Sequence, residues 1–149
     1  MGQLDRILAR HAIVGVDTSP FIYLWERHPR YFHLAEELFQ YLKLPRVQGV
    51  TSIITLIEAC IHPQKQGHPD LVQAYENALL HSQQVRMLSI NLALARKAID
   101  LRATYGIHVP DALQIAAALE AGATLFVTND RRLAKVREIE FLLFDDHTP

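Results

Sequence analysis

The sequence predicts an α/β fold in which helices cover both faces of a parallel sheet. Two observations support this class. Short apolar runs typical of strands alternate with helical segments along the whole chain. The strand segments are also continuously apolar, as burial of both sheet faces requires. The 149 residues are 50% hydrophobic and 21% charged, which is enough for one hydrophobic core, so we expect a single domain over residues 1–149.

Each predicted strand is a short apolar run bounded by polar or turn-forming residues. The first reads AIVGVD and ends in an acid, and the fourth reads TLFVT and leads into Asn-Asp. Runs of this length are typical of buried strands. The five strands are predicted at residues 12–17, 47–52, 85–90, 124–128 and 140–145.

The helices are predicted from apolar spacing and from residues that begin or end helices. Ser19 and Pro20 are suited to the N-cap and first position of the first helix, and Gly106 to a C-cap. Pro63 is expected to end the third helix, and residues 63–70 read as a loop because they hold two prolines and a glycine. The helical segments are residues 19–30, 31–44, 53–62, 71–83, 91–105, 110–122 (from Pro110 or Asp111), and one or two turns within 130–137.

Four acids lie where this fold gathers side chains. Asp17 and Asp130 come just after apolar strands, and Asp111 lies at a helix start. The carboxyl ends of parallel strands, and the helix starts that follow them, meet at one sheet edge, where ligands bind in such folds. Glu58 lies about two turns into the helix after the second strand, on the same side. We therefore expect these carboxylates to lie close together.

A cluster of carboxylates is unfavourable by itself, because like charges raise one another's pKa. A divalent cation relieves that repulsion, and oxygen ligands favour Mg²⁺ or Mn²⁺. Each acid also has a structural interpretation: Asp17 as a turn residue, Glu58 on a solvated helix face, and Asp111 and Asp130 as helix-capping acids. Clustering at the sheet edge favours the metal-binding interpretation.

At these residues the chain resembles a PIN-domain ribonuclease, of the kind found as the toxin in VapBC toxin–antitoxin pairs. The matching segments are VDTSPFIYL with Asp17, TLIEA with Glu58, and YGIHVPDALQIAAALEAGATLFVTND with Asp111 and Asp130. The resemblance implies a three-layer α/β/α sandwich on a mostly parallel five-stranded sheet. It further implies metal-dependent RNA cleavage that leaves a 5′-phosphate, with these four acids as the site and Thr128 as the adjacent polar residue.

The resemblance also implies two protein partners. One is a second copy of the chain, in a homodimer whose acidic sites share one groove. The other is a small antitoxin that binds DNA through its N-terminal half and this chain through its C-terminal segment. Phe21, Tyr23, Trp25 and Tyr31 are apolar and aromatic, and they are interpreted either as core residues or as part of a dimer face.

The remaining features bear on location and on RNA contact. One cysteine, Cys60, excludes an internal disulfide, no run is long enough to span a membrane, and the charged N-terminus is unlike a signal peptide. We therefore expect a cytoplasmic protein. A net charge of −1 leaves any RNA contact to local patches. One such patch is basic, and it is either a solvated helix face or a phosphate contact: Arg131, Arg132, Lys135 and Arg137.

Two functions other than that of a nuclease are considered from the sequence. A receiver-like signalling domain is excluded, because the third strand ends LSIN without an aspartate and no lysine follows Phe144. A PIN-like scaffold that binds RNA or protein without cutting stays open.

Asp145 and Asp146 follow the last strand, so they either reach the acidic edge or are only tail charge. Thr128 and Asn129 lie beside Asp130, where they could orient a water or a phosphate.

Overall fold

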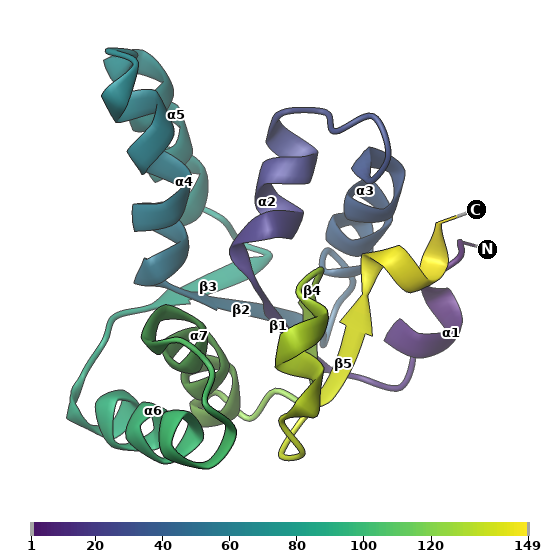
Figure 1. Ribbon diagram of the computed structural model, residues 1–149. Helices are drawn as coiled ribbons and strands as arrows, with labels where there is room; N and C mark the ends of the chain where they lie inside the picture. Colours follow the sequence, from purple (N-terminus) through teal and green to yellow (C-terminus); the bar gives the residue numbers. More distant parts are fainter. Residues whose placement is uncertain (1, 149) are drawn as a thin grey trace.

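The computed structural model describes residues 2–148 and contains one five-stranded parallel sheet. The strand order is β3-β2-β1-β4-β5, and each neighbouring pair is parallel (Figure 1). The predicted α/β fold is confirmed, and β1 lies at the centre of the sheet. The strands are β1 (Ile13–Val16), β2 (Gln48–Ser52), β3 (Val85–Leu88), β4 (Leu125–Thr128) and β5 (Glu140–Leu143).

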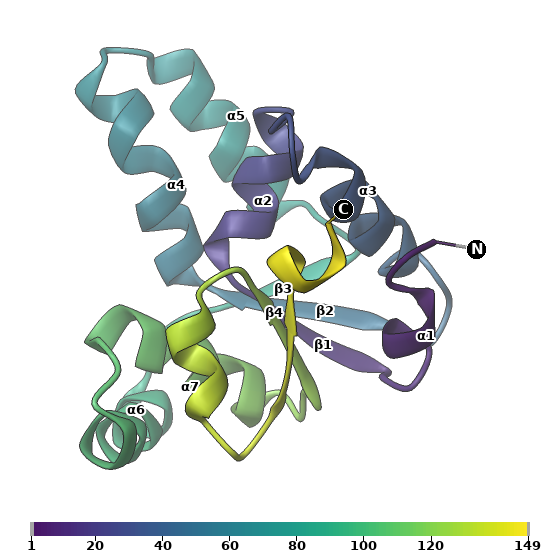
Figure 2. The ribbon, with the colours of Figure 1, turned by 45° about the vertical axis from the view of Figure 1, so that its right-hand side comes forward.

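Helices pack on both faces of this sheet and complete three layers. In Figures 1 and 2, α6 and α7 cover one face, and α2 and α3 lie across the other. The described helices are α1 (Asp5–Leu8), α2 (Thr18–Trp25), α3 (Phe32–Tyr41), α4 (Ile53–Lys65), α5 (Pro69–Leu80), α6 (Leu92–Tyr105) and α7 (Val109–Glu120), with 3-10 helices η1 (Arg131–Lys135) and η2 (Phe144–His147).

The two faces of the central strands build two separate hydrophobic cores. Leu125 and Val127 belong to the core under α2 and α3, whereas Phe126 belongs to the core under α6 and α7. This alternation explains why β4 is buried at every position, since no face of it meets solvent. Gly15 allows α7 to approach closely, because a Cβ there would lie 2.6 Å from the Cβ of Ala118. The close contact holds the C-terminal half of α7 against β1.

Several predicted boundaries are wrong. Pro63 does not end the third helix: α4 continues through it to Lys65, and its ring lies on the buried side of the helix. Burial near the end of the helix offsets the one lost hydrogen bond. The predicted loop at residues 63–70 shrinks to residues 66–68, because Pro69 begins α5. The helices α4 and α5 form a hairpin that projects beyond the sheet (Figures 1 and 2).

Other differences affect capping and the chain ends. Ser19 is not the N-cap of the first long helix; Asp17 is, and its carboxylate accepts a hydrogen bond from the Thr18 amide at 2.9 Å. The short helix α1 was not expected. The helix α7 begins at Val109, one residue before the earliest predicted start. Asp145 and Asp146 lie in η2 rather than at the end of a strand.

The aromatic residues considered for a dimer face pack within the chain. Phe21 and Tyr31 are buried in the core, and Tyr23 packs against Tyr31 with ring centroids 4.6 Å apart. Trp25 stacks on Tyr75 at the same centroid distance. The core interpretation holds for Phe21 and Tyr31. Tyr23 and Trp25 pack against the core but stay partly exposed, so the dimer-face interpretation of these two stays a prediction. Within residues 2–148, the helices are all too short or too polar to cross a membrane.

Candidate functional site

A pocket of about 640 Å³ at the carboxyl edge of the sheet contains every predicted site residue. It is bounded by the ends of β1 and β4 and by the starts of α2, α7 and η1, with Glu58 from α4. The edges of β1 and β4 are held together because the Asp17 amide donates to the Val127 carbonyl at 2.9 Å. The predicted residues that line it are Asp17, Glu58, Asp111, Thr128 and Asp130.

Asp17 is the most buried acid of the pocket, with a side chain held by three donors. It is 9% exposed and accepts hydrogen bonds from the Thr18 amide, the Thr128 hydroxyl at 2.7 Å and the Gln114 amide at 3.3 Å. Burial raises the pKa of Asp17, and these hydrogen bonds, led by that of Thr128, oppose the rise. The carboxylate is thus fixed in direction yet short of a compensating charge.

Glu58 reaches the pocket from α4 and is linked to Asp17 through one hydroxyl. The Thr18 hydroxyl donates to a Glu58 oxygen at 2.6 Å. Burial raises the pKa of Glu58, and the nearby Asp17 carboxylate raises it further. Glu58 is exposed on α4, as its structural interpretation expects, and its carboxylate also lines the pocket through the contact with Thr18.

Asp111 shows the electrostatic repulsion of the cluster most directly. Its pKa is raised to about 6, first by burial and then by the charges of Asp17, Asp130 and Glu58. These four carboxylates raise one another's cost of ionisation, as the sequence predicts for a clustered set.

Asp130 differs because a neighbouring guanidinium compensates its charge. Arg132 donates to its two oxygens, from Nε at 3.0 Å and from Nη2 at 2.6 Å, and this pairing lowers the pKa of Asp130. Arg131 forms an ion pair with Asp146 at 2.5 Å, outside the pocket floor. Arg131 and Arg132 are exposed, as both interpretations of the basic stretch require, and each also pairs with an acid of the same chain.

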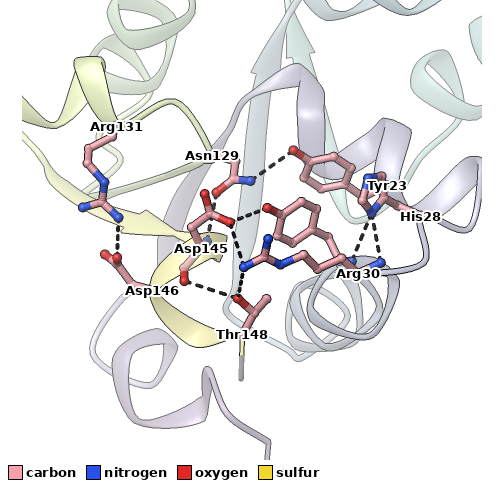
Figure 3. A network of polar contacts seen from close by, with 9 residues as sticks. Tyr23, His28, Arg30, Asn129, Arg131, Asp145, Asp146 and Thr148 are labelled. Atoms are coloured by element: carbon pink, nitrogen blue, oxygen red, sulfur yellow. Dashed lines mark hydrogen bonds and ion pairs between the residues drawn. The ribbon is translucent and has the colours of Figure 1, made fainter.

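Thr128 and Asn129 line the pocket and also form hydrogen bonds within the chain. The Thr128 side chain is fully buried, and its hydroxyl donates to Asp17 while accepting from the Asp130 amide at 3.1 Å. The Asn129 amide donates to the Tyr23 hydroxyl at 3.2 Å (Figure 3). These hydrogen bonds position two acids and the pocket rim, and the expectation that the two residues orient a water or a phosphate stays a prediction.

The C-terminal segment braces the same rim. Figure 3 shows Asp145 beside Asn129 and Arg30, and the backbone amide of Asp145 donates to the Asn129 side chain at 2.9 Å. The Tyr31 hydroxyl donates to the Asp145 carboxylate. Thr148 accepts from Arg30 at 3.1 Å. Neither Asp145 nor its neighbour Asp146 lines the acidic pocket, so both have structural contacts there rather than a place among the clustered acids.

The pocket offers the ligand chemistry of a hard divalent cation. Its candidate donors are all oxygens, as Mg²⁺ and Mn²⁺ prefer, and the raised pKa of Asp111 reflects negative charge that a cation would offset. Among residues 2–148, however, no three His, Cys, Asp or Glu side chains already stand in a metal-binding arrangement. One reason is that Asp130 forms an ion pair with Arg132, so a cation that binds Asp130 has to compete with that guanidinium.

The sequence interpretation missed Gln114, Thr18, Ser52 and Thr55, which form a buried polar layer beneath the acids. Gln114 is 2% exposed and contacts Asp17 and the three hydroxyl groups. A signal was present, because Gln114 is the one polar side chain in the apolar run ALQIAAAL and lies one helical turn after Asp111.

Asp111→Asn should stabilise the metal-free protein above pH 6 and leave it unchanged near pH 4. The folded-state pKa of Asp111 is about 6 against an ordinary value of 3.8, so the wild type loses stability as pH rises through this window. The variant escapes that loss, which we expect to be about 1 kcal/mol after allowing for solvent screening of a partly exposed group. Urea unfolding in EDTA from pH 4 to pH 8 measures it.

Asp100→Asn, at an exposed position on α6, is the matched control for losing one carboxylate. A difference between Asp111→Asn and wild type that stays constant across the pH range would contradict the proposed charge repulsion.

Comparison with known proteins agrees with this geometry. A family model described as "PIN domain" matches residues 14–139. Among curated proteins, none matches the chain. Three solved structures share the fold: a toxin–antitoxin complex from Klebsiella pneumoniae, VapBC2 from Rickettsia felis bound to a promoter DNA fragment, and VapC20 from Mycobacterium tuberculosis, described as a sarcin-ricin loop cleaving toxin.

The similarity of these three structures is in backbone arrangement more than in sequence. Their TM-scores are 0.67, 0.66 and 0.67, and their sequence identities are 21%, 18% and 20%. The matches cover 89%, 88% and 86% of this chain and 97%, 98% and 98% of the respective structures. The shared arrangement therefore extends over nearly the whole length of each protein.

Proposed function

The chain belongs to the PIN domain family, and on that premise we propose that it is a metal-dependent endoribonuclease that acts as the toxin of a toxin–antitoxin pair. One observation carries the nuclease proposal. Four carboxylates converge in one pocket at the carboxyl edge of the sheet, where burial first, and then the charges of the other three acids, raise the pKa of Asp111 to about 6. A scaffold without chemistry gains nothing from such an unfavourable cluster.

The roles of the residues follow from their contacts. Asp17, Asp111, Asp130 and Glu58 would hold Mg²⁺ or Mn²⁺, which when bound supplies an activated water and offsets phosphate charge. Thr128 orients Asp17 and positions the backbone of Asp130, as its two hydrogen bonds indicate. Residues 1–149 form a single domain in this proposal, and that domain contains the four acids and Thr128.

Substrate binding is assigned to the basic side chains at the rim of the pocket. Arg131 and Arg132 both line it, with side chains 66% and 65% exposed. A guanidinium binds phosphate oxygens through paired hydrogen bonds, so these residues suit contact with an RNA backbone. If a cation were bound by Asp130, Arg132 would lose its ion pair with that acid and would be free for such a contact. An RNA substrate also implies a cytoplasmic location.

The direct test is a cleavage assay on total RNA with the purified chain. We expect cuts in Mg²⁺ or Mn²⁺, none in EDTA, and 5′-phosphates at the mapped cleavage sites. Intact RNA under every metal condition would overturn the nuclease proposal and favour the alternative, a PIN-like domain that binds RNA or protein without cutting.

The toxin proposal rests on the fold shared with the three toxin–antitoxin structures and on the nature of the activity. One of these proteins is described as a toxin that cleaves RNA of the sarcin-ricin loop, and another is bound to promoter DNA. By analogy, the partner of this chain is a small DNA-binding antitoxin. A ribonuclease active in its own cytoplasm needs such an inhibitor.

We expect the purified protein to be a homodimer. Phe21 and Tyr31 are buried and Tyr23 and Trp25 are partly exposed. Other large apolar side chains are exposed on α4 and α5, among them Ile57, Ile61 and Leu71. A dimer that covers such side chains gains hydrophobic stabilisation. Sedimentation should give twice the 17.0 kDa of one chain. A mass of one chain over a wide concentration range would exclude this assembly.

A further inference from the structure

A single buried glutamine connects the acids of the pocket to the layer beneath them. Gln114 projects from α7 one turn after Asp111 and is 2% exposed. Its amide nitrogen lies 2.8 Å from the Thr55 hydroxyl, 3.2 Å from the Thr18 hydroxyl and 3.3 Å from a carboxylate oxygen of Asp17. Its amide oxygen accepts a hydrogen bond from the Ser52 hydroxyl.

Among the described residues, the neighbouring hydroxyl protons are already used, so the Gln114 amide is the donor on which the Thr18 and Thr55 oxygens depend. The Thr51 hydroxyl donates to the Val16 carbonyl at 2.8 Å, so the 2.7 Å contact between Thr51 and Thr55 uses the proton of Thr55. The Thr18 hydroxyl donates to Glu58. The oxygens of Thr18 and Thr55, 3.2 Å apart, therefore have no proton left for each other. Both depend on the amide of Gln114.

The direction of the amide is fixed by the same count. Two amide protons face three acceptors, namely Asp17, Thr18 and Thr55, whereas the amide oxygen faces the donor Ser52. A flipped amide would set its oxygen against three acceptors, one of them a carboxylate, and leave the Ser52 proton without a partner. An unmade hydrogen bond of this kind is costly in a buried site.

We propose that Gln114 is a positioning residue that sets the direction of two acids in the pocket, and this rests on the proposed function. It acts on Asp17 directly. It acts on Glu58 through Thr18, because an amide proton received by the Thr18 oxygen leaves the Thr18 proton directed at Glu58. Loss of the amide removes one of the three donors to Asp17 and lets the Thr18 hydroxyl turn away from Glu58, so cation affinity falls even though every proposed ligand is still present.

The test compares Gln114→Met with wild type in Mn²⁺ binding, followed by electron paramagnetic resonance without RNA. Methionine keeps the length and unbranched shape of glutamine but cannot donate. We expect the Mn²⁺ dissociation constant to rise about 10- to 100-fold, the range for loss of a group that orients metal ligands. In RNA cleavage, kcat should fall with little change in KM, because the basic residues of the rim are untouched.

Two further variants cover the case in which Gln114→Met does not fold. Gln114→Glu keeps the shape and places another acid against Asp17, so we expect a loss of Mn²⁺ affinity at least as large. Ser52→Ala keeps Gln114 but removes the hydroxyl that fixes the amide, and we expect a smaller rise, about 3-fold, in the dissociation constant. The matched control is Tyr41→Phe, which removes a hydrogen bond to the His11 carbonyl at the opposite end of the sheet. It should leave Mn²⁺ binding unchanged.

The outcomes separate this inference from the proposed function. If wild type binds Mn²⁺ and cuts RNA, but the Gln114 and Ser52 variants bind Mn²⁺ as wild type does, Gln114 is only a packing residue and the inference is overturned. If wild type neither binds Mn²⁺ nor cuts RNA, the proposed function and the inference both fall. Weaker binding in the variants with unchanged binding in Tyr41→Phe supports the positioning role.

Discussion

Asp17→Asn should abolish divalent-dependent RNA cleavage while the protein stays folded. Asp17 is the acid at the centre of the cluster, because it follows the middle strand of the sheet and receives hydrogen bonds from Thr18, Thr128 and Gln114. Replacing one ligand oxygen and removing the charge should lower the cleavage rate more than about 100-fold, the upper range for losing a group that only orients a ligand.

The fold should survive because asparagine has the size of aspartate and keeps one oxygen to cap α2. Burial raises the pKa of Asp17, so its charge is a cost to the folded state, and the variant should be no less stable than wild type in metal-free buffer. Cleavage rates at saturating Mg²⁺ and thermal unfolding in EDTA measure both expectations. Full activity in a pure Asp17→Asn sample would show that the site is wrongly assigned.

Asp146→Asn is the matched control for this substitution. It removes one carboxylate near the pocket rim, where Asp146 pairs with Arg131 in exposed surroundings. Exposed ion pairs contribute less than about 1 kcal/mol, so we expect no measurable change in stability and a change in cleavage rate of less than about 3-fold.

The fold was predictable because its strands carry an unambiguous signal. A strand such as LFVT, with three consecutive apolar residues and burial at every position, fits a sheet covered on both faces. The acids were predictable for the same reason. Once β1 and β4 are parallel, an acid after each of them lies at one edge, and the pairing of Val16 with Val127 puts Asp17 beside Thr128.

What the sequence left undetermined depends on partners distant in the chain. Whether Pro63 ends α4 depends on its burial, and burial is a tertiary property. The role of Gln114 depends on Ser52 and Thr55, which lie 62 and 59 residues away. The pairing of Asp130 with Arg132 is local, yet it competes with the metal-binding role of the same acid, and sequence spacing does not rank the two.

Expression of the wild-type chain alone should arrest the growth of a bacterial host and degrade its RNA. The physical basis is the proposed metal-dependent cleavage of RNA at the acidic pocket, in which Arg132 pairs with Asp130. Exposed ion pairs of this kind contribute less than about 1 kcal/mol, so Arg132 is a weak competitor for a cation. Growth curves and RNA profiles after induction measure the effect, and Asp17→Asn is the matched non-toxic control.

Co-expression with the antitoxin from a neighbouring gene should restore growth, and the purified complex should lack ribonuclease activity until the partner is degraded. The contact of Arg132 with Asp130 shows the chemistry available to such a partner, since one guanidinium binds both oxygens of an acid in this pocket. Burial raises the pKa of both Asp17 and Asp111, and an arginine from a partner helix laid into an apolar groove could supply a counter-charge to them. If expression of the chain alone leaves growth and cellular RNA unchanged while the acids are intact, the toxin proposal is wrong. A nuclease restricted to a rare substrate, or a silent binding scaffold, would then be the better account of this pocket.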